Sequence, residues 1–219
     1  KPGTVDTRPI GLFRGIYRVW SKARCAIIKS WVAGRPQDSE VVNMLPCRQT
    51  LDAVWRAQVT AEGDLSHDCH ALEVLWDIAK CYENVGHATL QHQATQQEYP
   101  MQILRVSLAS YRWERLLLCE YDTLSEAIFP ARGIVAGSSH ATFEIALLVQ
   151  EALAKARSEL PECKLSIHVD DLSISVTRRN LDALIEDTTK VALRIKDVLQ
   201  VELGLPIAEA KSQVIASST

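Results

Sequence analysis

Two adjacent carboxylates, Asp170 and Asp171, lie between two apolar runs in the last third of the chain. Residues 164–169 and residues 172–177 both alternate between apolar and polar side chains. This period of two on either side of a short acidic break predicts a β-hairpin with one buried face and the acids at its tip. Because neighbouring carboxylates repel each other, a divalent cation that prefers oxygen ligands, such as Mg²⁺, would stabilise them. The alternative is an Asp-rich turn without a metal, since Asp is common in turns.

A third carboxylate, Asp77, follows directly after the mostly apolar run of residues 72–76. A strand that ends in Asp places a carboxylate at the edge of a sheet, where a substrate can reach it. The alternative is that Asp77 caps a following helix, because Asp is a preferred N-cap residue. Together with Asp170 and Asp171, it would supply the ligands that two divalent ions need to activate a 3′-hydroxyl and stabilise a leaving pyrophosphate. Phosphoryl transfer of this kind depends mainly on positioning and on stabilisation of charge.

The spacing of apolar residues predicts the elements that position these acids. Ser138 or Ser139 would cap a long helix, and Pro161 would stop its growth. The expected elements are helices over residues 11–32, 50–60, 84–93, 100–112, 138–160 and 181–199, a polar loop over 61–70, and strands over 71–77, 114–121, 127–129 and 213–216.

Six stretches, in the same order along the chain, resemble the fingers and palm motifs of reverse transcriptases, in particular those of non-LTR retroelements and group II introns. The resemblance extends over almost the whole chain. The family patterns are RPISLL…YK, STLDA, DxxKAFDxV, RGVPQGS, YxDD and LGL…K(T/S). The matching stretches are Arg8-Pro9-Ile10-Gly11-Leu12 with Tyr17-Arg18, residues 49–53 (QTLDA), residues 77–85 (DIAKCYENV), residues 132–138 (RGIVAGS), His168-Val169-Asp170-Asp171, and residues 203–205 (LGL) with Lys211-Ser212.

The resemblance implies an α+β fold: the fingers and palm of a right-hand polymerase, with an antiparallel palm sheet backed by helices and with the thumb absent. Residues 1–70 would form a helical, fingers-like part and residues 71–219 the palm, within one reverse transcriptase domain over 1–219. The implied activity is RNA-directed DNA synthesis: extension of a primer on an RNA or DNA template from dNTPs, with two Mg²⁺ ions or with Mn²⁺ in their place. The parent retroelement protein would supply the missing thumb and other domains.

The resemblance also implies roles for the acidic residues and for one lysine. Asp77 and Asp170 would bind the catalytic metals, with Asp171 as a less direct acidic partner. Lys211 matches a position that would protonate the departing pyrophosphate. Its alternative is a surface lysine that follows a loop.

Four further residues would contact the nucleotide. The ring of Tyr82 would lie under the sugar and clash with a 2′-hydroxyl, which favours deoxynucleotides. Lys80 and Arg8 would contact the triphosphate, and Gly137 would allow the backbone to approach the nucleotide or template closely. Apart from the resemblance, Tyr82 is an ordinary buried tyrosine, Lys80 and Arg8 are solvated charges, and Gly137 is a turn residue.

Two positions near the primer and template depart from the family pattern. Ala136 replaces the Gln that precedes Gly137, which removes a polar contact to the nucleotide. His168 replaces the Tyr of YxDD, where it would stack or hydrogen-bond near the primer end or serve only as a polar-face residue. Neither change removes a metal ligand, so both bear on processivity, fidelity or activity and leave the fold assignment unaffected.

Composition restricts the class of protein. The chain of 219 residues is 47% hydrophobic and 23% charged, which is ordinary for a globular domain. No apolar run approaches the ~18 residues that span a bilayer, and no signal peptide is visible, so we expect an intracellular protein of the nucleus or cytoplasm, neither secreted nor membrane-bound. The six scattered cysteines contain no C-x-x-C pair, which favours reduced thiols. Lys1 in place of Met favours a fragment of a longer protein.

The net charge of −3 argues against a nucleic-acid enzyme, but the charge is unevenly distributed. Residues 1–35 carry eight basic side chains against Asp6 alone, a net charge of +7. Such a segment would follow a phosphate backbone, or it forms a solvated helix face, and both interpretations can hold together.

Two other functions compete with the reverse transcriptase hypothesis. An RNA-dependent RNA polymerase shares the palm, but Tyr82 argues against it because RNA synthesis must admit the 2′-hydroxyl. A catalytically inactive relic or scaffold would retain the fold. Ala136, His168 and the missing thumb favour this alternative, whereas the three intact aspartates favour the enzyme.

Overall fold

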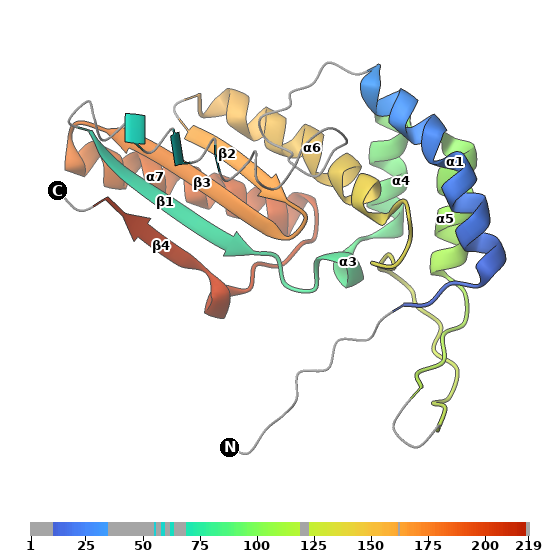
Figure 1. Cartoon of the computed structure of the whole chain (residues 1–219). Coiled ribbons are helices and arrows are strands. Elements are labelled where there is room, and N and C mark those ends of the chain that lie inside the picture. Colours follow the sequence, from blue (N-terminus) through green and yellow to red (C-terminus); the bar gives the residue numbers. More distant parts are fainter. Residues whose placement is uncertain are drawn as a thin grey trace.

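The structure is a computed structural model that describes residues 11–34, 69–118, 123–161 and 163–217, together with Trp55, Gln58, Val59, Glu62 and Gly63. A four-stranded sheet with helices against it occupies one part of the molecule, and a group of helices lies beside it (Figure 1). The helices are α1 (Gly15–Ala33), α3 (Cys81–Asn84), α4 (His87–Gln96), α5 (Met101–Tyr111), α6 (Ala141–Glu159) and α7 (Leu181–Asp197), and the strands are β1 (His70–Asp77), β2 (Cys163–His168), β3 (Asp171–Arg178) and β4 (Gln213–Ala216).

The sheet is antiparallel throughout, with the strand order β2-β3-β1-β4. Strands β2 and β3 form the hairpin that the alternating sequence predicts, and β1 pairs with the other edge of β3. The register of β1 on β3 runs from His70 opposite Arg178 to Asp77 opposite Asp171. The end of β1 therefore lies beside the turn of the hairpin, although the two segments are far apart in the sequence.

The apolar face of the sheet forms the floor of the core. Every second residue of the hairpin is buried: Cys163, Leu165, Ile167, Leu172, Ile174 and Val176. Helix α7 packs on β1 and β3 with a single stripe of buried residues at helical spacing: Leu184, Thr188, Val191 and Ile195. Helix α6 is buried on several sides because it lies between β2 and α4. Each fully buried Leu or Ile contributes about 1.5–3 kcal/mol, so this interior fixes the position of the sheet.

Helix α1 packs on the helical part of the molecule and leaves its outer face in solvent (Figure 1). Its buried residues are Tyr17, Ser21, Ile28 and Val32, and the indole N–H of Trp31 donates to the carbonyl of Gln97 at 3.1 Å. The helix predicted over residues 11–32 is thus confirmed, with its start at Gly15, and Gly34 forms its C-cap. None of the helices that the structure describes combines the length and apolar character that crossing a bilayer requires.

Several predicted elements differ from the structure. The strands expected over 114–121 and 127–129 are wrong within the described residues, which form only isolated bridges between Arg115 and Ile128 and between Leu118 and Leu124. Their apolar side chains are largely exposed. They therefore have no buried face on which a regular ladder could form.

The expected serine cap of α6 is also wrong. His140 is the N-cap residue and makes no side-chain cap bond, because Ser138 and Ser139 lie before the helix and bond to α1 instead. The helix predicted over 84–93 is divided into α3 and α4 at Val85-Gly86. The helix predicted over 181–199 ends at Asp197 and continues as a π-helical turn, Val198–Glu202. The predictions for 50–60 and 61–70 lie mostly outside the described residues.

Candidate active site

The turn between β2 and β3 carries the acidic pair. Val169 has a φ of 62°, a left-handed conformation that is unusual for a β-branched residue and costs about 1–3 kcal/mol. Two contacts with the chain after β1 hold this turn in place. The amide of Ile78 donates to the carbonyl of Asp170 at 2.8 Å, and the thiol of Cys81 lies 3.9 Å from the carbonyl of Val169. The strained turn is therefore locked against the end of β1.

The register of the sheet brings three predicted site residues into one row. Asp171 lies opposite Asp77 on one side and opposite His168 on the other. Side chains directly opposite each other on antiparallel strands share a face, with Cβ atoms about 4.5–5.5 Å apart. Asp77 is not the cap of the following helix, because α3 begins at Cys81 with Lys80 as its N-cap. The alternative role considered for Asp77 is thus wrong.

Burial and the neighbouring acids raise the proton affinity of Asp171. The pKa of Asp171 is raised by partial burial and by the negative charges of Asp170 and Asp77, while His168 and Lys211 oppose the shift. Burial, followed by the charge of Asp170, raises the pKa of the Cys81 thiol to about 12. The three carboxylates therefore create a strongly negative electrostatic potential at the end of β1 and the β2–β3 turn.

Lys211 partly neutralises this charge. Its Nζ lies 2.8 Å from Oδ2 of Asp77, with side chains 55% and 16% exposed respectively. The backbone positions Lys211, because Ala208 donates to the carbonyl of Asp77 and Ala79 donates to that of Pro206, both at 2.8 Å. No sequence pattern predicts this direct contact between Lys211 and an aspartate.

The carboxylates match a divalent cation in donor type and in charge, since hard oxygen ligands suit Mg²⁺ and the mutual repulsion at Asp171 is relieved by a cation. Among the residues that the structure describes, no group of three or more His, Cys, Asp or Glu side chains is arranged to hold a metal ion. Asp77 is engaged by Lys211 in this arrangement. Asp77, Asp170 and Asp171 are the residues that would hold an ion once that pair opens.

Tyr82 lies close to the acids. Its ring is half-buried, and burial raises the pKa of its hydroxyl, with Asp170 among the smaller contributors. The carbonyl of Tyr82 accepts a hydrogen bond from the amide of Ile134 at 2.8 Å. This bond connects Tyr82 to the loop that leads to Ala136 and Gly137.

Gly137 is required by the protein's own backbone. A Cβ atom at this position would lie 2.5 Å from the carbonyl oxygen of Gly11, so the loop fits tightly against the chain that enters α1. This close approach is a reason for glycine that the sequence did not indicate. Both Ala136 and Gly137 are exposed, so their backbone remains accessible to a ligand.

The other residues predicted for the site lie at its edge or outside the residues that the structure describes. Lys80 is exposed and has a left-handed backbone, with a φ of 47°. His168 is half-buried, and its Nδ1 has no hydrogen-bond partner in the described part of the chain. Arg8 lies outside the described residues. The structure therefore places Asp77, Asp171 and His168 in one row across the sheet, and Lys211 forms an ion pair with Asp77. Asp170 lies in the adjoining turn.

Comparison with known protein families shows to which family the chain belongs. The sequence matches the family described as Reverse transcriptase (RNA-dependent DNA polymerase) over residues 1–219. The chain belongs to the reverse transcriptase family. Comparison with curated proteins at the level of individual sequences gives no match.

The fold is similar to that of solved telomerases. Telomerase from Candida tropicalis, truncated from its C-terminal domain, matches with a TM-score of 0.64 and 16% identity over 93% of this chain and 41% of that chain. The C. tropicalis enzyme in complex with the TWJ fragment of telomeric RNA gives 0.67 and 15% over 93% and 34%. The corresponding complex from Candida albicans gives 0.55 and 12% over 93% and 34%. This reverse transcriptase chain thus spans less than half the length of these telomerases, and the expected α+β fold is confirmed.

Proposed function

We propose that this chain carries the catalytic centre of an RNA-directed DNA polymerase, which extends a primer on a nucleic-acid template from dNTPs by two-metal phosphoryl transfer. The observation that carries the proposal is the register that sets Asp77 opposite Asp171, with Asp170 in the adjoining turn. The motif pattern further supports a protein of a non-LTR retroelement or group II intron. Such a protein would act in the nucleus or cytoplasm with a thumb and other domains.

The role of the carboxylates follows from their position. Bound divalent ions would supply charge neutralisation for the 3′-hydroxyl and the triphosphate. Asp77 and Asp170 are the ligands in this proposal, and Asp171 adds negative charge beside them. The backbone bond from Ile78 to the carbonyl of Asp170 keeps the two halves of this ligand set together. Preorganisation of this kind lowers the barrier to phosphoryl transfer.

Lys211 would have two roles in this reaction. Its ammonium stabilises the Asp77 carboxylate at 2.8 Å until a cation and a triphosphate enter. Because the side chain is 55% exposed, it can then turn toward the leaving pyrophosphate and donate a proton from Nζ. The ring of Tyr82, adjacent to the acids, would select against a 2′-hydroxyl.

Primer extension with a labelled primer on an RNA template tests the proposal, using the protein at its full natural length. We expect Mg²⁺-dependent incorporation of dNTPs that falls on the order of 10²-fold or more in Asp170→Asn. Loss of a residue that only hydrogen-bonds to a metal ligand already costs about 10–100-fold in metal affinity or activity. Asp182→Asn, an exposed carboxylate in the first turn of α7, is the matched control and should retain activity. Equal activity of wild type and Asp170→Asn would overturn the proposal.

A second candidate is a catalytically inactive protein that retains the fold. Ala136 in the nucleotide loop and the engagement of Asp77 by Lys211 favour it. The same assay separates the two functions, because an inactive scaffold gives no incorporation in either the wild type or Asp170→Asn while both proteins remain folded.

A further inference from the structure

Two segments that are far apart in the sequence lie side by side next to Tyr82. The amide of Ile134 donates to the carbonyl of Tyr82, and the amide of Gly133 donates to the carbonyl of Val85, both at 2.8 Å. The approach is close, because a Cβ atom at Gly133 would lie 2.8 Å from the carbonyl oxygen of Glu83. The backbone that carries the Tyr82 ring is therefore tied to the loop that begins at Gly133.

His87 adds a side-chain bond to this contact. Its Nε2 lies 2.7 Å from the carbonyl oxygen of Gly133, and its Nδ1 accepts a hydrogen bond from Nε of Arg112 at 3.3 Å. Because a carbonyl only accepts and a guanidinium only donates, both bonds form only with the neutral imidazole that carries its proton on Nε2. His87 thus connects the start of α4, the loop at Gly133, and Arg112, the C-cap residue of α5.

This side-chain bond is shielded from solvent. His87 is 5% exposed, and its ring stacks on that of Tyr111 with the centroids 6.5 Å apart. Gly133 is also buried. A buried carbonyl that loses its donor keeps the full cost of its desolvation, so the bond to His87 holds the Gly133 carbonyl in one position.

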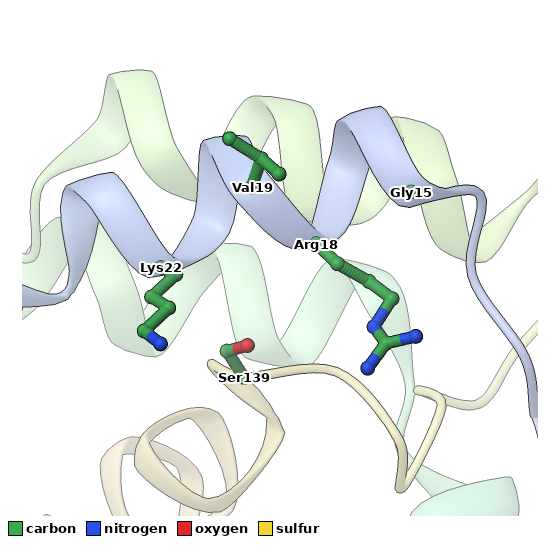
Figure 2. Close-up of a pocket in the computed structure, with 5 residues that line it drawn as sticks. All are labelled: Gly15, Arg18, Val19, Lys22 and Ser139. Carbon is green, nitrogen blue, oxygen red and sulfur yellow. The ribbon is translucent and has the colours of Figure 1, made fainter.

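The other end of the same loop is anchored separately. The Tyr17 hydroxyl and Oγ of Ser138 form a hydrogen bond at 3.2 Å, and the hydroxyls of Ser21 and Ser139 form another at 3.1 Å. Figure 2 shows Ser139 facing α1, with an open cavity of about 420 Å³ between them, so little packing supports the loop there. Hydrogen bonds therefore fix both ends of the loop, and the end that contacts Tyr82 includes the bond from His87.

Exclusion of a substituent by contact requires a fixed wall, because repulsion between atoms rises steeply as they overlap. In the proposed reaction the Tyr82 ring excludes a 2′-hydroxyl. A displacement of about 1 Å at a reacting site can change a rate 10²-fold. A ring on a mobile backbone would admit the ribonucleotide and still accept the deoxynucleotide, so the rigidity of this segment decides how well the two sugars are distinguished.

We propose that His87 is a positioning residue for sugar selection: through Gly133 and Ile134 it holds Tyr82 where the ring excludes the 2′-hydroxyl. In this role His87 touches neither the nucleotide nor a metal and acts only through the loop. The inference rests on the proposed polymerase function, because it requires Tyr82 to face the incoming sugar. It assigns specificity to a buried residue that lies outside all six of the matching sequence stretches.

Two amide substitutions at His87 test the proposal. The amide nitrogen of Gln lies close to the place of the ring Nε2 and can donate to Gly133, whereas the shorter Asn reaches only the place of Nδ1. The measurement is the ratio of kcat/KM for matched dNTP and rNTP in primer extension by the protein at its full natural length. We expect His87→Asn to lower this ratio on the order of 10-fold, at the low end of the range for one steric contact, and His87→Gln to remain close to wild type.

A second variant leaves the interior intact. Arg112 is exposed, and Arg112→Met removes the donor to Nδ1 of His87 without changing a buried side chain. We expect it to lower the ratio in the same direction and by less than His87→Asn does. A ratio that neither His87→Asn nor Arg112→Met changes would overturn the proposal.

The control separates positioning from a general loss of stability. Leu90 is fully buried on the same helix, one turn after His87, and Leu90→Ala removes apolar packing there. It should lower the stability of the protein and leave the sugar ratio unchanged at a temperature where all variants are folded. If Leu90→Ala relaxes sugar selection as much as His87→Asn does, the proposal is wrong.

Hydrogen exchange followed by NMR gives a readout that needs no catalysis. The amides of Gly133 and Ile134 should exchange slowly, because they donate to the carbonyls of Val85 and Tyr82. We expect their exchange to accelerate on the order of 10-fold in His87→Asn and to remain slow in His87→Gln, with the amides of β3 as the unchanged internal reference. Faster exchange with an unchanged sugar ratio in an active protein would mean that His87 is only structural, and would also overturn the proposal.

The two proposals fail in different ways. A protein without primer extension but with His87-dependent exchange at Gly133 and Ile134 would refute the polymerase and retain the positioning of Tyr82. Primer extension that is lost in Asp170→Asn, with a sugar ratio that does not respond to His87→Asn, would refute the positioning role and retain the polymerase.

Discussion

The ion pair between Lys211 and Asp77 places a cation where the proposed mechanism requires a metal. An exposed ion pair contributes only ~0–1 kcal/mol to stability, but Asp77 is mostly buried, so its charge has few other partners. The ammonium therefore competes with any divalent ion for the same oxygen.

Because of this competition, we expect removal of the Lys211 ammonium to strengthen metal binding and to slow catalysis. Lys211→Gln removes the competing cation, so we expect tighter binding of Mg²⁺, measured by titration calorimetry. The same variant lacks the proton donor, so single-turnover incorporation should slow on the order of 10²-fold. Lys190→Gln, an exposed lysine of α7, should change neither quantity. Faster incorporation by Lys211→Gln would show that the lysine is only an inhibitor of the site.

The ring of Tyr82 gives a second prediction. Removing the ring in Tyr82→Val should admit the 2′-hydroxyl and raise the use of rNTPs relative to dNTPs by about 10–200-fold, the range that one steric contact provides. Tyr82→Phe keeps the ring and should keep the discrimination. The measurement is the ratio of kcat/KM for matched rNTP and dNTP. An unchanged ratio in Tyr82→Val would show that the ring does not contact the sugar.

Among the helices, strands and loops, the hairpin of β2 and β3 could be predicted from the sequence alone, because its apolar alternation is strict on both sides of the acids. Strand β4 was also predicted with its observed bounds, and β1 to within one residue. The run at 114–129 has similar strand-forming residues, but it lacks a layer to cover it. Residues with a high strand propensity therefore do not form a regular strand here, because no other layer packs against them.

The register of β1 on β3 could not be predicted from either strand alone, because pairing between distant strands depends on the topology of the sheet. The resemblance to reverse transcriptases predicted that Asp77 and Asp171 converge, and the sheet brings them opposite each other. The contact between Lys211 and Asp77 depends on the path of residues 206–211 along the end of β1. That path left no signal in the sequence.

The loop before α6 gives a third prediction. Gly137→Ala should force the loop away from Gly11, because its Cβ would lie 2.5 Å from a backbone oxygen. We expect the free energy of unfolding to fall by about 1–3 kcal/mol, as for other overpacked sites. Gly15→Ala is the matched control, since a Cβ there meets nothing within 4 Å. Urea unfolding of both variants measures the difference, and equal stability would show that the loop moves without cost.

A buried polar cluster couples the stability of the whole protein to pH. Glu144 is fully buried and accepts a hydrogen bond from Tyr111 at 2.5 Å. Burial raises its pKa from 4.5 to about 7. The folded state therefore holds a proton that the unfolded state releases between about pH 4.5 and 7, and stability falls as pH rises through that window. His140, also fully buried, has its pKa lowered by burial and acts in the opposite direction, because folding is disfavoured as pH falls below 6.5.

Glu144→Gln should remove the first of these effects. The neutral amide keeps an acceptor for Tyr111 and has no charge to desolvate. We expect the variant to exceed wild type by roughly 3 kcal/mol in free energy of unfolding at pH 8, with little difference near pH 4.5. Glu151→Gln, an exposed site on the same helix, should show no pH-dependent gain. Urea unfolding at the two pH values measures both, and a gain of equal size at both would contradict the assigned pKa.

Strand β4 forms one margin of the sheet, and all four of its residues are exposed. Its outward amides and carbonyls have no neighbouring strand in the described chain. Uncovered margins of this kind recruit additional strands. Concentrated solutions of this chain will therefore be prone to self-association by sheet extension, and charged substitutions at Val214 or Ile215 are the direct means of keeping it monomeric.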